Sequence, residues 1–262
     1  MMAGQGDDRY VARLAADEAD IGAALRLRYR VFVEELGAQG PGVDHQTRTE
    51  QDAFDGYFDH LVLVDTTVDP ASGDHVVGVY RLLTCDAMRR VGRFYSEDEF
   101  DLSLLHASGR RLLELGRSCI DVDHRGGTGM FLLWNALARF VIEREIQILF
   151  GAASFPGTDV ASLAAPLSLL HHAHLAPPSL RVRAIGAGAG QVPLIPKARL
   201  DRRAALAATP ALIKAYLRLG GFVGEGVYVD HAFNTTDVCL VMDTTRMSQK
   251  HRDFYLRKGE GA

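Results

Sequence analysis

The sequence predicts an α+β fold in which a central mixed β-sheet is flanked by helices. The first observation is a pair of apolar runs, His60 to Asp65 and His75 to Thr84, joined across the turn residues of DPASGD, which is typical of an antiparallel hairpin. The second is the order strand, glycine loop, helix and strand from Arg111 to Ala152, which favours two parallel strands. Both strand directions in one chain indicate a mixed sheet.

Hydrophobic spacing predicts the N-terminal elements. Tyr10 to Ala15 is predicted to be a strand, and Glu18 to Leu36 an amphipathic helix with Asp17 as its N-cap. The predicted apolar side of this helix consists of Ile21, Leu25, Tyr29, Phe32 and Val33. Gly37 to Gly56 is polar and irregular, and such a loop inside a compact domain is more often functional than idle.

The second half of the chain continues the pattern. Arg111 to Val122 is predicted to be a strand, Gly127 to Glu145 a helix with Trp134 in the core, and Ile146 to Ala152 a buried strand. A proline-broken helical segment follows, and the remaining predicted elements are a helix at Pro210 to Leu219, strands at Phe222 to Val229 and Thr236 to Asp243, and a short charged helix at the end. No linker is visible, so residues 9–257 are predicted to form one domain between flexible tails at 1–8 and 258–262.

Composition argues against nucleic acid as a partner. The 262 residues are 47% hydrophobic and 24% charged with a formal net charge of −4, whereas nucleic-acid partners usually require a strongly basic face. Cys85, Cys119 and Cys239 lack metal-type spacing and lie in runs that are predicted to be strands, and no secretory signal is visible, so reduced core thiols in the cytoplasm are expected. Residues 160–180 carry no charged side chain but contain prolines and histidines, which makes them a poor membrane span.

Three histidines close together, His171, His172 and His174, suggest a metal site. No matching set of Asp, Glu or Cys ligands surrounds them in the sequence. Adjacent helical side chains also diverge by roughly 100°. Packing or the lining of a site is therefore favoured, and no metal is predicted.

Charged residues inside apolar runs are the main functional signal. GVYRLL places Arg81 in one predicted strand, and ELGRSCID places Glu114 and Arg117 in another. EQDAFD puts Glu50, Asp52 and Asp55 on one loop. Because an unpaired buried charge costs several kcal/mol or more, such residues need either partners or a chemical role. From the residues alone, a buried ion-pair cluster and an active site both remain open.

The glycine loop HRGGTG opens the predicted helix that follows ELGRSCID. Free backbone N–H groups at a helix start can hold a phosphate. This arrangement resembles the GNAT acyltransferase superfamily, whose signature is a strand, Arg or Gln, two residues, Gly, one residue, Gly or Ala, and a helix. Here His124 stands first, followed by Arg125, Gly127 and Gly129. The resemblance implies that these four residues bind the phosphopantetheine of the donor.

Further motifs narrow the resemblance. LRYRVFVEELG, EQDAFD, GVYRLL and ELGRSCID match the order and spacing shared by ornithine lipid acyltransferases and acyl-homoserine lactone synthases. The later blocks FGAASFPGTD, LHHAHLAP, PALIKAYLRLGGFVGEG and FNTTDVCLV resemble the ornithine lipid branch. The implied activity is transfer of a 3-hydroxyacyl group from acyl carrier protein to the α-amine of L-ornithine, which gives lyso-ornithine lipid. No cofactor is expected, because the phosphopantetheine arm enters as part of the donor.

The resemblance also implies roles for individual residues. Glu50 and Glu114 are the candidates for the base that takes the proton of the amine. The tetrahedral oxyanion would be held by backbone N–H groups after Arg117, at Ser118, Cys119 and Ile120. Arg81 or Arg117 would hold the ornithine carboxylate, and the candidates for its distal ammonium are Asp52, Asp55, Asp230 and Asp237.

Partner surfaces can be predicted from charge. The basic stretch ending at Arg199, Arg202 and Arg203 is the predicted docking site for acyl carrier protein, which is typically acidic. The expected location is the cytoplasm, with contact to the inner membrane surface left open. Two alternatives remain: transfer to another amine, as in acyl-homoserine lactone synthases, and a non-enzymatic lipid-binding or membrane-binding protein.

Overall fold

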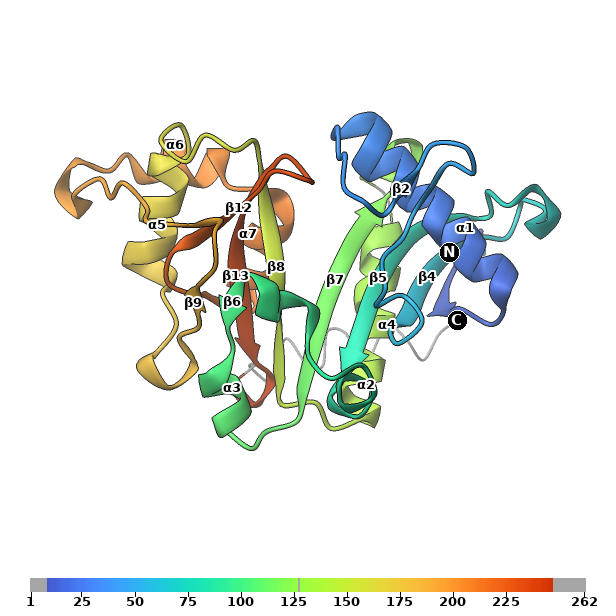
Figure 1. Ribbon diagram of the computed structural model, residues 1–262, viewed down its shortest axis with the longest axis horizontal. Helices are drawn as coiled ribbons and strands as arrows, with labels where there is room; N and C mark the ends of the chain where they lie inside the picture. Colours follow the sequence, from blue (N-terminus) through green and yellow to red (C-terminus); the bar gives the residue numbers. More distant parts are fainter. Residues whose placement is uncertain (1–8, 127, 247–262) are drawn as a thin grey trace, which may run out of the picture. The chain divides into compact units, whose positions relative to one another are not determined.

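The computed structural model describes residues 9–126 and 128–246. These residues form two compact units (Figure 1): one contains the chain up to residue 83 together with 115–145, and the other contains 84–114 and 146–246. We call them unit 1 and unit 2. The mixed sheet with flanking helices confirms the predicted α+β class. The organisation as one domain stays a prediction.

Unit 1 contains the N-terminal half of the strand order, β1-β4-β5-β7. β1 pairs with β4 and β4 with β5, both antiparallel, so the hairpin across DPASGD is confirmed. The elements are β1 Tyr10–Leu14, α1 Glu18–Arg28, the π-helix η1 Tyr29–Glu35, β2 Val43–Asp44, β3 Thr49–Glu50, β4 Asp59–Asp65, the 3₁₀ turns Pro70–Ser72 and Val122–His124, β5 Val76–Thr84 and α4 Gly129–Glu143.

Helices α1 and α4 contact alternate residues of the strands of unit 1. Val62 and Val64 of β4 pack in one core cluster with Ala23, Ala24 and Leu27 of α1. A methyl group at Gly129, the first residue of α4, would instead meet the Leu63 side chain at 2.7 Å. Because successive strand residues point to opposite faces, α1 and α4 cover opposite faces of these strands. His60, two residues before Val62, therefore belongs to the α1 face.

Strand β7, Leu112–Ile120, begins in unit 2 and ends in unit 1. Its first three residues pair with Ile148–Phe150 of β8 in parallel, which confirms the predicted crossover. The other elements of unit 2 are α2 Cys85–Val91, η3 Tyr95–Asp98, β6 Phe100–Asp101, α3 Ser103–Ala107, β8 Ile148–Pro156, α5 Ala164–His174, η5 Pro178–Leu180, β9 Arg183–Ala184, β10 Ala189–Gly190, η6 Lys197–Arg199, α6 Arg202–Ala208, α7 Ala211–Arg218, β11 Phe222–Val223, β12 Val227–Asp230, β13 Thr235–Asp243 and η7 Thr244–Arg246.

The long antiparallel pair of β8 and β13 forms the centre of unit 2, in the order β7-β8-β13-β12-β10, with β11 also on β13. The predicted strand at Phe222 to Val229 is wrong as one element, because it divides into β11 and β12 around Gly226, which has a φ of 82°. The predicted terminal helix lies outside the described residues. Every helix within 9–126 and 128–246 is too short or too polar to span a bilayer.

Two local predictions fail for identifiable reasons. The helix from Glu18 is α-helical only to Arg28 and continues as a π-helix. Its buried side also differs from the predicted apolar side, because the two sets share only Tyr29. The buried residues are Asp20, Ala23, Ala24, Leu27, Arg28, Tyr29 and Val31. Cys85 begins α2 instead of lying in a strand, because the Thr84 side chain accepts from Ala87 N and caps a new helix. The N-cap at Asp17 is confirmed by its bond from Asp20 N.

Candidate functional site

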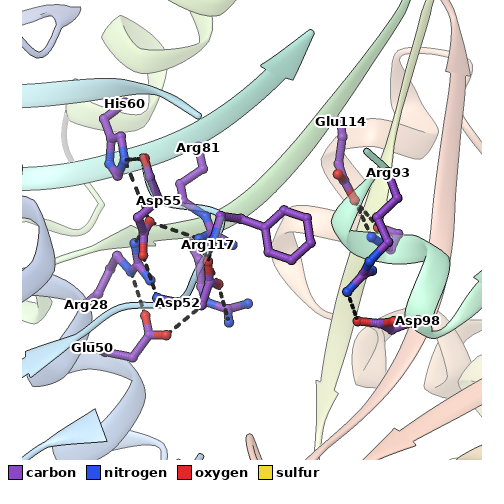
Figure 2. Close-up of polar contacts among 12 residues, drawn as sticks. Arg28, Glu50, Asp52, Asp55, His60, Arg81, Arg93, Asp98, Glu114 and Arg117 are labelled. Carbon is purple, nitrogen blue, oxygen red and sulfur yellow. Dashed lines mark hydrogen bonds and ion pairs between the residues drawn. The ribbon is translucent and has the colours of Figure 1, made fainter. Parts of the chain in front are cut away.

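The loop residues Glu50, Asp52 and Asp55 meet three arginines of unit 1. Figure 2 shows their side chains pointing toward Arg28, Arg81 and Arg117. Arg28 lies in α1, Arg81 in β5 and Arg117 in β7. The three acidic residues lie close together in the chain: Glu50 ends β3, and Asp52 and Asp55 lie in the loop that follows. We call this set of six residues the ion-pair network.

Arg28 is the buried centre of the network. Its side chain is fully buried. Its Nε donates to Glu50 Oε2 at 2.6 Å, and its Nη1 donates to Asp55 Oδ1 at 2.5 Å. Sequence reasoning missed Arg28 as a site residue, because only apolar residues were used to predict the buried side of the helix.

Arg81 joins the two aspartates. Its Nη1 lies 2.8 Å from both carboxylate oxygens of Asp52 and 2.9 Å from Asp55 Oδ1. Its guanidinium carbon also lies 4.4 Å from the centroid of the Phe58 ring, in a cation–π contact. Burial alone would raise the pKa of Asp55, but Arg81 and Arg28 outweigh it and hold this pKa well below its usual range. Arg81 likewise lowers the pKa of Asp52 against its burial.

Arg117 makes the longest contacts among the ion pairs of the network. Its Nε lies 3.3 Å from Glu50 Oε1, and its Nη2 lies 3.3 Å from Asp52 Oδ2. Its backbone has a φ of 49°, a left-handed conformation that costs a non-glycine residue about 1–2 kcal/mol. Strain of this kind persists where the surrounding structure holds it, often at functional sites.

The strain at Arg117 allows a matched test. In Arg117→Ala the strained φ remains, whereas in Arg117→Gly it costs nothing, and both variants lose the same guanidinium. Arg117→Gly should therefore be more stable than Arg117→Ala by about 1 kcal/mol. Denaturant unfolding measures the difference. Equal stability of the two variants would mean that the backbone relaxes in Arg117→Ala. If both variants lose acyl transfer to the same extent, the lost activity is due to the missing guanidinium charge.

His60 of β4 lies behind the network and was also missed. Its Nε2 is 3.2 Å from the backbone oxygen of Asp55, and its register partner on β5 is Arg81. Burial lowers the pKa of His60, so the ring is neutral at neutral pH. A neutral imidazole that donates to Asp55 O fixes the turn that carries Asp55 without adding a charge.

The network balances its own charges. Three guanidinium groups face three carboxylates. Each predicted binding residue within it, Arg81, Arg117, Asp52 and Asp55, therefore contacts an opposite charge inside the protein. The assignments of the ornithine carboxylate and ammonium to these residues stay predictions.

Glu114 lies in unit 2 and is held by the start of η3. It accepts from the backbone N–H groups of Tyr95 and Ser96 at 2.8 and 2.6 Å, and from the Ser96 hydroxyl. The close-up in Figure 2 includes this carboxylate. Glu114 is 1% exposed, and these neutral donors help to hold its carboxylate in place.

The strand residues after Arg117 carry the predicted oxyanion donors Ser118, Cys119 and Ile120. Burial raises the pKa of the Cys119 thiol to about 12. A thiol with this pKa is protonated at neutral pH and is a poor nucleophile. Cys239 is buried as well, and burial raises its pKa.

The side chains of the predicted phosphate loop contact other parts of unit 1. Tyr10 Oη lies 2.9 Å from His124 Nδ1, and Arg125 donates to both oxygens of Glu35 at 2.6 Å. Gly127 lies outside the described residues, and Gly129 begins α4. Backbone donors at the start of α4 therefore remain the candidates for a phosphate, and the predicted role of the four residues is untested.

The remaining predicted residues lie in unit 2. Asp230 ends β12 and Asp237 lies on β13, whereas Arg199, Arg202 and Arg203 are exposed on η6 and α6. His172 Nε2 lies 2.9 Å from Ile195 O, so this side chain ties the segment before η6 to α5.

Comparison with sequences of known activity gives close matches. A protein-family model described as "Acetyltransferase (GNAT) domain" matches residues 27–135. A relative named L-ornithine N(alpha)-acyltransferase from Rhodobacter capsulatus is 60% identical over 252 residues, which are 96% of this chain and 96% of the relative. A relative of the same name from Agrobacterium fabrum is 39% identical and covers 93% of this chain and 84% of its own length.

Solved structures show the same fold at low identity. A coenzyme A-dependent acyl-homoserine lactone synthase has a TM-score of 0.51 at 14% identity, covering 95% of this chain and 88% of its own. An N-acyl amino acid synthase from uncultured soil microbes has a TM-score of 0.50 at 12% identity, covering 91% and 92%. The predicted GNAT-like fold is confirmed by these matches.

Proposed function

The chain belongs to the family of L-ornithine N(alpha)-acyltransferases, and from this premise we propose that it transfers a 3-hydroxyacyl group from acyl carrier protein to the α-amine of L-ornithine. The product is lyso-ornithine lipid, so the reaction is the first step of ornithine lipid biosynthesis. The observation that carries the proposal is the 60% identity, which extends over 96% of both chains and therefore over both units.

In the proposed reaction the α-amine attacks the thioester carbonyl, the carbon–sulfur bond breaks, and the phosphopantetheine thiol leaves. The amine must lose a proton for this attack. Protonation of Glu50 would remove a counter-charge from Arg28 and Arg117, which both contact it. Glu114 instead accepts from neutral N–H and O–H groups. We therefore assign Glu114 as the base that takes the proton of the amine, and Glu50 as a structural residue.

The ion-pair network supports the reaction by fixing β7. Arg117 precedes the predicted oxyanion donors by one to three residues, and its contacts with Glu50 and Asp52 hold this part of the strand. A preorganised backbone N–H can contribute roughly 3 kcal/mol to transition-state stabilisation.

The donor is proposed to dock on unit 2 through Arg199, Arg202 and Arg203. All three are exposed, and Asp201 caps α6 by accepting from Arg203 N and Ala204 N. Basic side chains at the start of a helix attract an acidic partner. Contact with the inner membrane surface, where a lipid product is needed, remains part of the proposal.

The docking surface can be tested by charge reversal. Replacing Arg202 and Arg203 together by Glu should raise the KM for the acyl carrier protein thioester at least several-fold, with a smaller effect at high salt, because screening weakens long-range attraction. The melting temperature should stay unchanged. Arg218→Glu, at an exposed position of α7, is the matched control, and an equal effect there would argue against a specific docking surface.

The deciding experiment measures thiol release from 3-hydroxyacyl carrier protein with L-ornithine, and with lysine, glutamine and S-adenosylmethionine in parallel. Release that depends on L-ornithine supports the proposal. Release with S-adenosylmethionine alone would assign the chain to lactone synthesis, and release with another amino acid would change the acceptor. Binding of lipid vesicles without release on any amine would favour the non-enzymatic alternative.

A further inference from the structure

A second group of carboxylates lies in unit 2, away from the sequence motifs with buried charges. Glu99, Asp230 and Asp237 each place one carboxylate oxygen within 4.8 Å of the other two. We call these three residues the acidic cluster. Glu99 and Asp237 are buried and Asp230 is half-buried. Glu99 is absent from the predicted site residues, because nothing in the sequence around it resembles a motif.

The backbone fixes each member of the cluster. Asp230 Oδ1 accepts from Ala232 N at 2.8 Å and Phe233 N at 3.1 Å, which closes the turn between β12 and β13. Glu99 O accepts from Ile185 N at 2.8 Å. Asp237 lies on β13 and is paired with Ser154 of β8 and Tyr228 of β12. The cluster is therefore built before any ligand arrives.

Thr235 provides an independent sign of a ligand. It is 9% exposed, and its Oγ1 is buried without a hydrogen-bond partner. Its register partner is Asp230, and it is two residues from Asp237 on the same strand. Paired residues and residues two apart share one face of a sheet, so this hydroxyl lies on the face of the cluster. A buried hydroxyl without a partner is costly, and a donor ligand would satisfy it.

The same face gathers negative charge and reaches solvent. Burial, together with Glu99, Asp230 and Asp237, raises the pKa of the Tyr228 phenol. Ser154, the β8 partner of Asp237, is exposed. A cation can thus approach along β8 and would be attracted by the three carboxylates.

We propose that the acidic cluster binds the distal ammonium group of the acceptor amino acid and thereby selects L-ornithine over amino acids with a neutral side chain. Three oxygens at about 2.8 Å around a tetrahedral ammonium nitrogen lie roughly 4.6 Å apart, which fits the 4.8 Å limit of the cluster. This inference rests on the proposed function. It selects Asp230 and Asp237 from the four predicted candidates and adds Glu99, whereas Asp52 and Asp55 already face arginines.

The test compares L-ornithine with L-2-aminopentanoic acid, which has the same carbon chain and no distal amine. Calorimetric binding to the full chain without donor should favour L-ornithine in the wild type. Asp237→Asn and Glu99→Gln should each reduce the affinity for L-ornithine about tenfold or more, because charge-assisted hydrogen bonds are lost. Affinity for L-2-aminopentanoic acid should change little. Glu225→Gln, at an exposed carboxylate of unit 2, is the matched control.

The outcomes separate this inference from the proposed function. If both variants keep the wild-type preference for L-ornithine, the cluster is not the ammonium site. Tight binding of Ca²⁺ alone, with ornithine binding unaffected by the two variants, would make it a metal site and overturn the inference. Because binding is measured without the thioester, absence of acyl transfer in the wild type would remove the proposed function only. Thr235→Val, which removes a hydroxyl without removing a charge, gives a second measurement if an acidic variant fails to fold.

Discussion

Glu114→Gln should lower kcat/KM for L-ornithine by about a hundredfold to ten-thousandfold, which is the usual contribution of a general base. The amide keeps the shape of the side chain and can still accept from Tyr95 N or Ser96 N, so the protein should remain folded. The acid limb of the pH–rate profile, which reports ionisation of the base, should disappear with the carboxylate. Steady-state thiol release across pH measures both effects.

Ser96→Ala is the control for this prediction. It removes the hydroxyl donor to Glu114 and leaves both backbone donors in place, so the activity should fall far less than in Glu114→Gln. Glu50→Gln provides the contrast, because its loss of activity should come together with a lower melting temperature. Activity within tenfold of wild type in a folded Glu114→Gln would place the base elsewhere.

Arg28→Met should destabilise unit 1 by about 3–5 kcal/mol, the usual cost of removing one partner from a buried ion pair. The Arg28 side chain is 0% exposed and that of Glu50 is 2% exposed. Glu50 would keep its contact with Arg117 and Asp55 its contact with Arg81, but the variant would leave an excess negative charge buried in the network. The single tryptophan of the chain, Trp134, lies in α4 of unit 1. Urea unfolding followed by its fluorescence therefore reports on this unit.

A surface pair provides the comparison for Arg28→Met. Glu34 and Arg48 of unit 1 are ion-paired with side chains 38% and 58% exposed, and exposed pairs contribute roughly 0–1 kcal/mol. Glu34→Gln should therefore leave the unfolding midpoint almost unchanged. If Arg28→Met costs less than about 1 kcal/mol, the network is not a determinant of stability and its arginines would be better regarded as binding residues.

The parts of the fold that depend on local patterns could be predicted from the sequence. Alternating apolar residues and the turn chemistry of DPASGD gave the β4–β5 hairpin, and the strand, loop, helix and strand order gave the parallel pairing of β7 with β8. The strand embedding of Arg81, Glu114 and Arg117 correctly indicated buried charges with partners.

The partners themselves depend on tertiary packing, which local patterns do not encode. Arg28 lies outside the predicted apolar side of its helix, yet the carboxylates of the following loop make its burial possible. A better signal was available: Asp20, Ala23, Ala24, Leu27, Arg28 and Val31 recur at helical spacing with small residues, as in a closely packed helix. Glu99 had no such signal, since only the folding of three separate segments brings it to Asp230 and Asp237.

The π-helix after α1 has a consequence for how this chain can vary in length. Leu36 N bonds to Val31 O, five residues back, and Ala38 N bonds to Phe32 O beyond Gly37, whose φ is 77°. A wide turn of this type accommodates one more residue than an α-helical turn. Deleting one residue between Tyr29 and Glu35 would restore α-helical winding, because the residue that now bonds five positions back would then bond four positions back. The segment downstream would keep its direction, so Glu35 would still face Arg125. A single-residue gap in this segment of a relative would therefore leave this ion pair, and Arg28 upstream, in place.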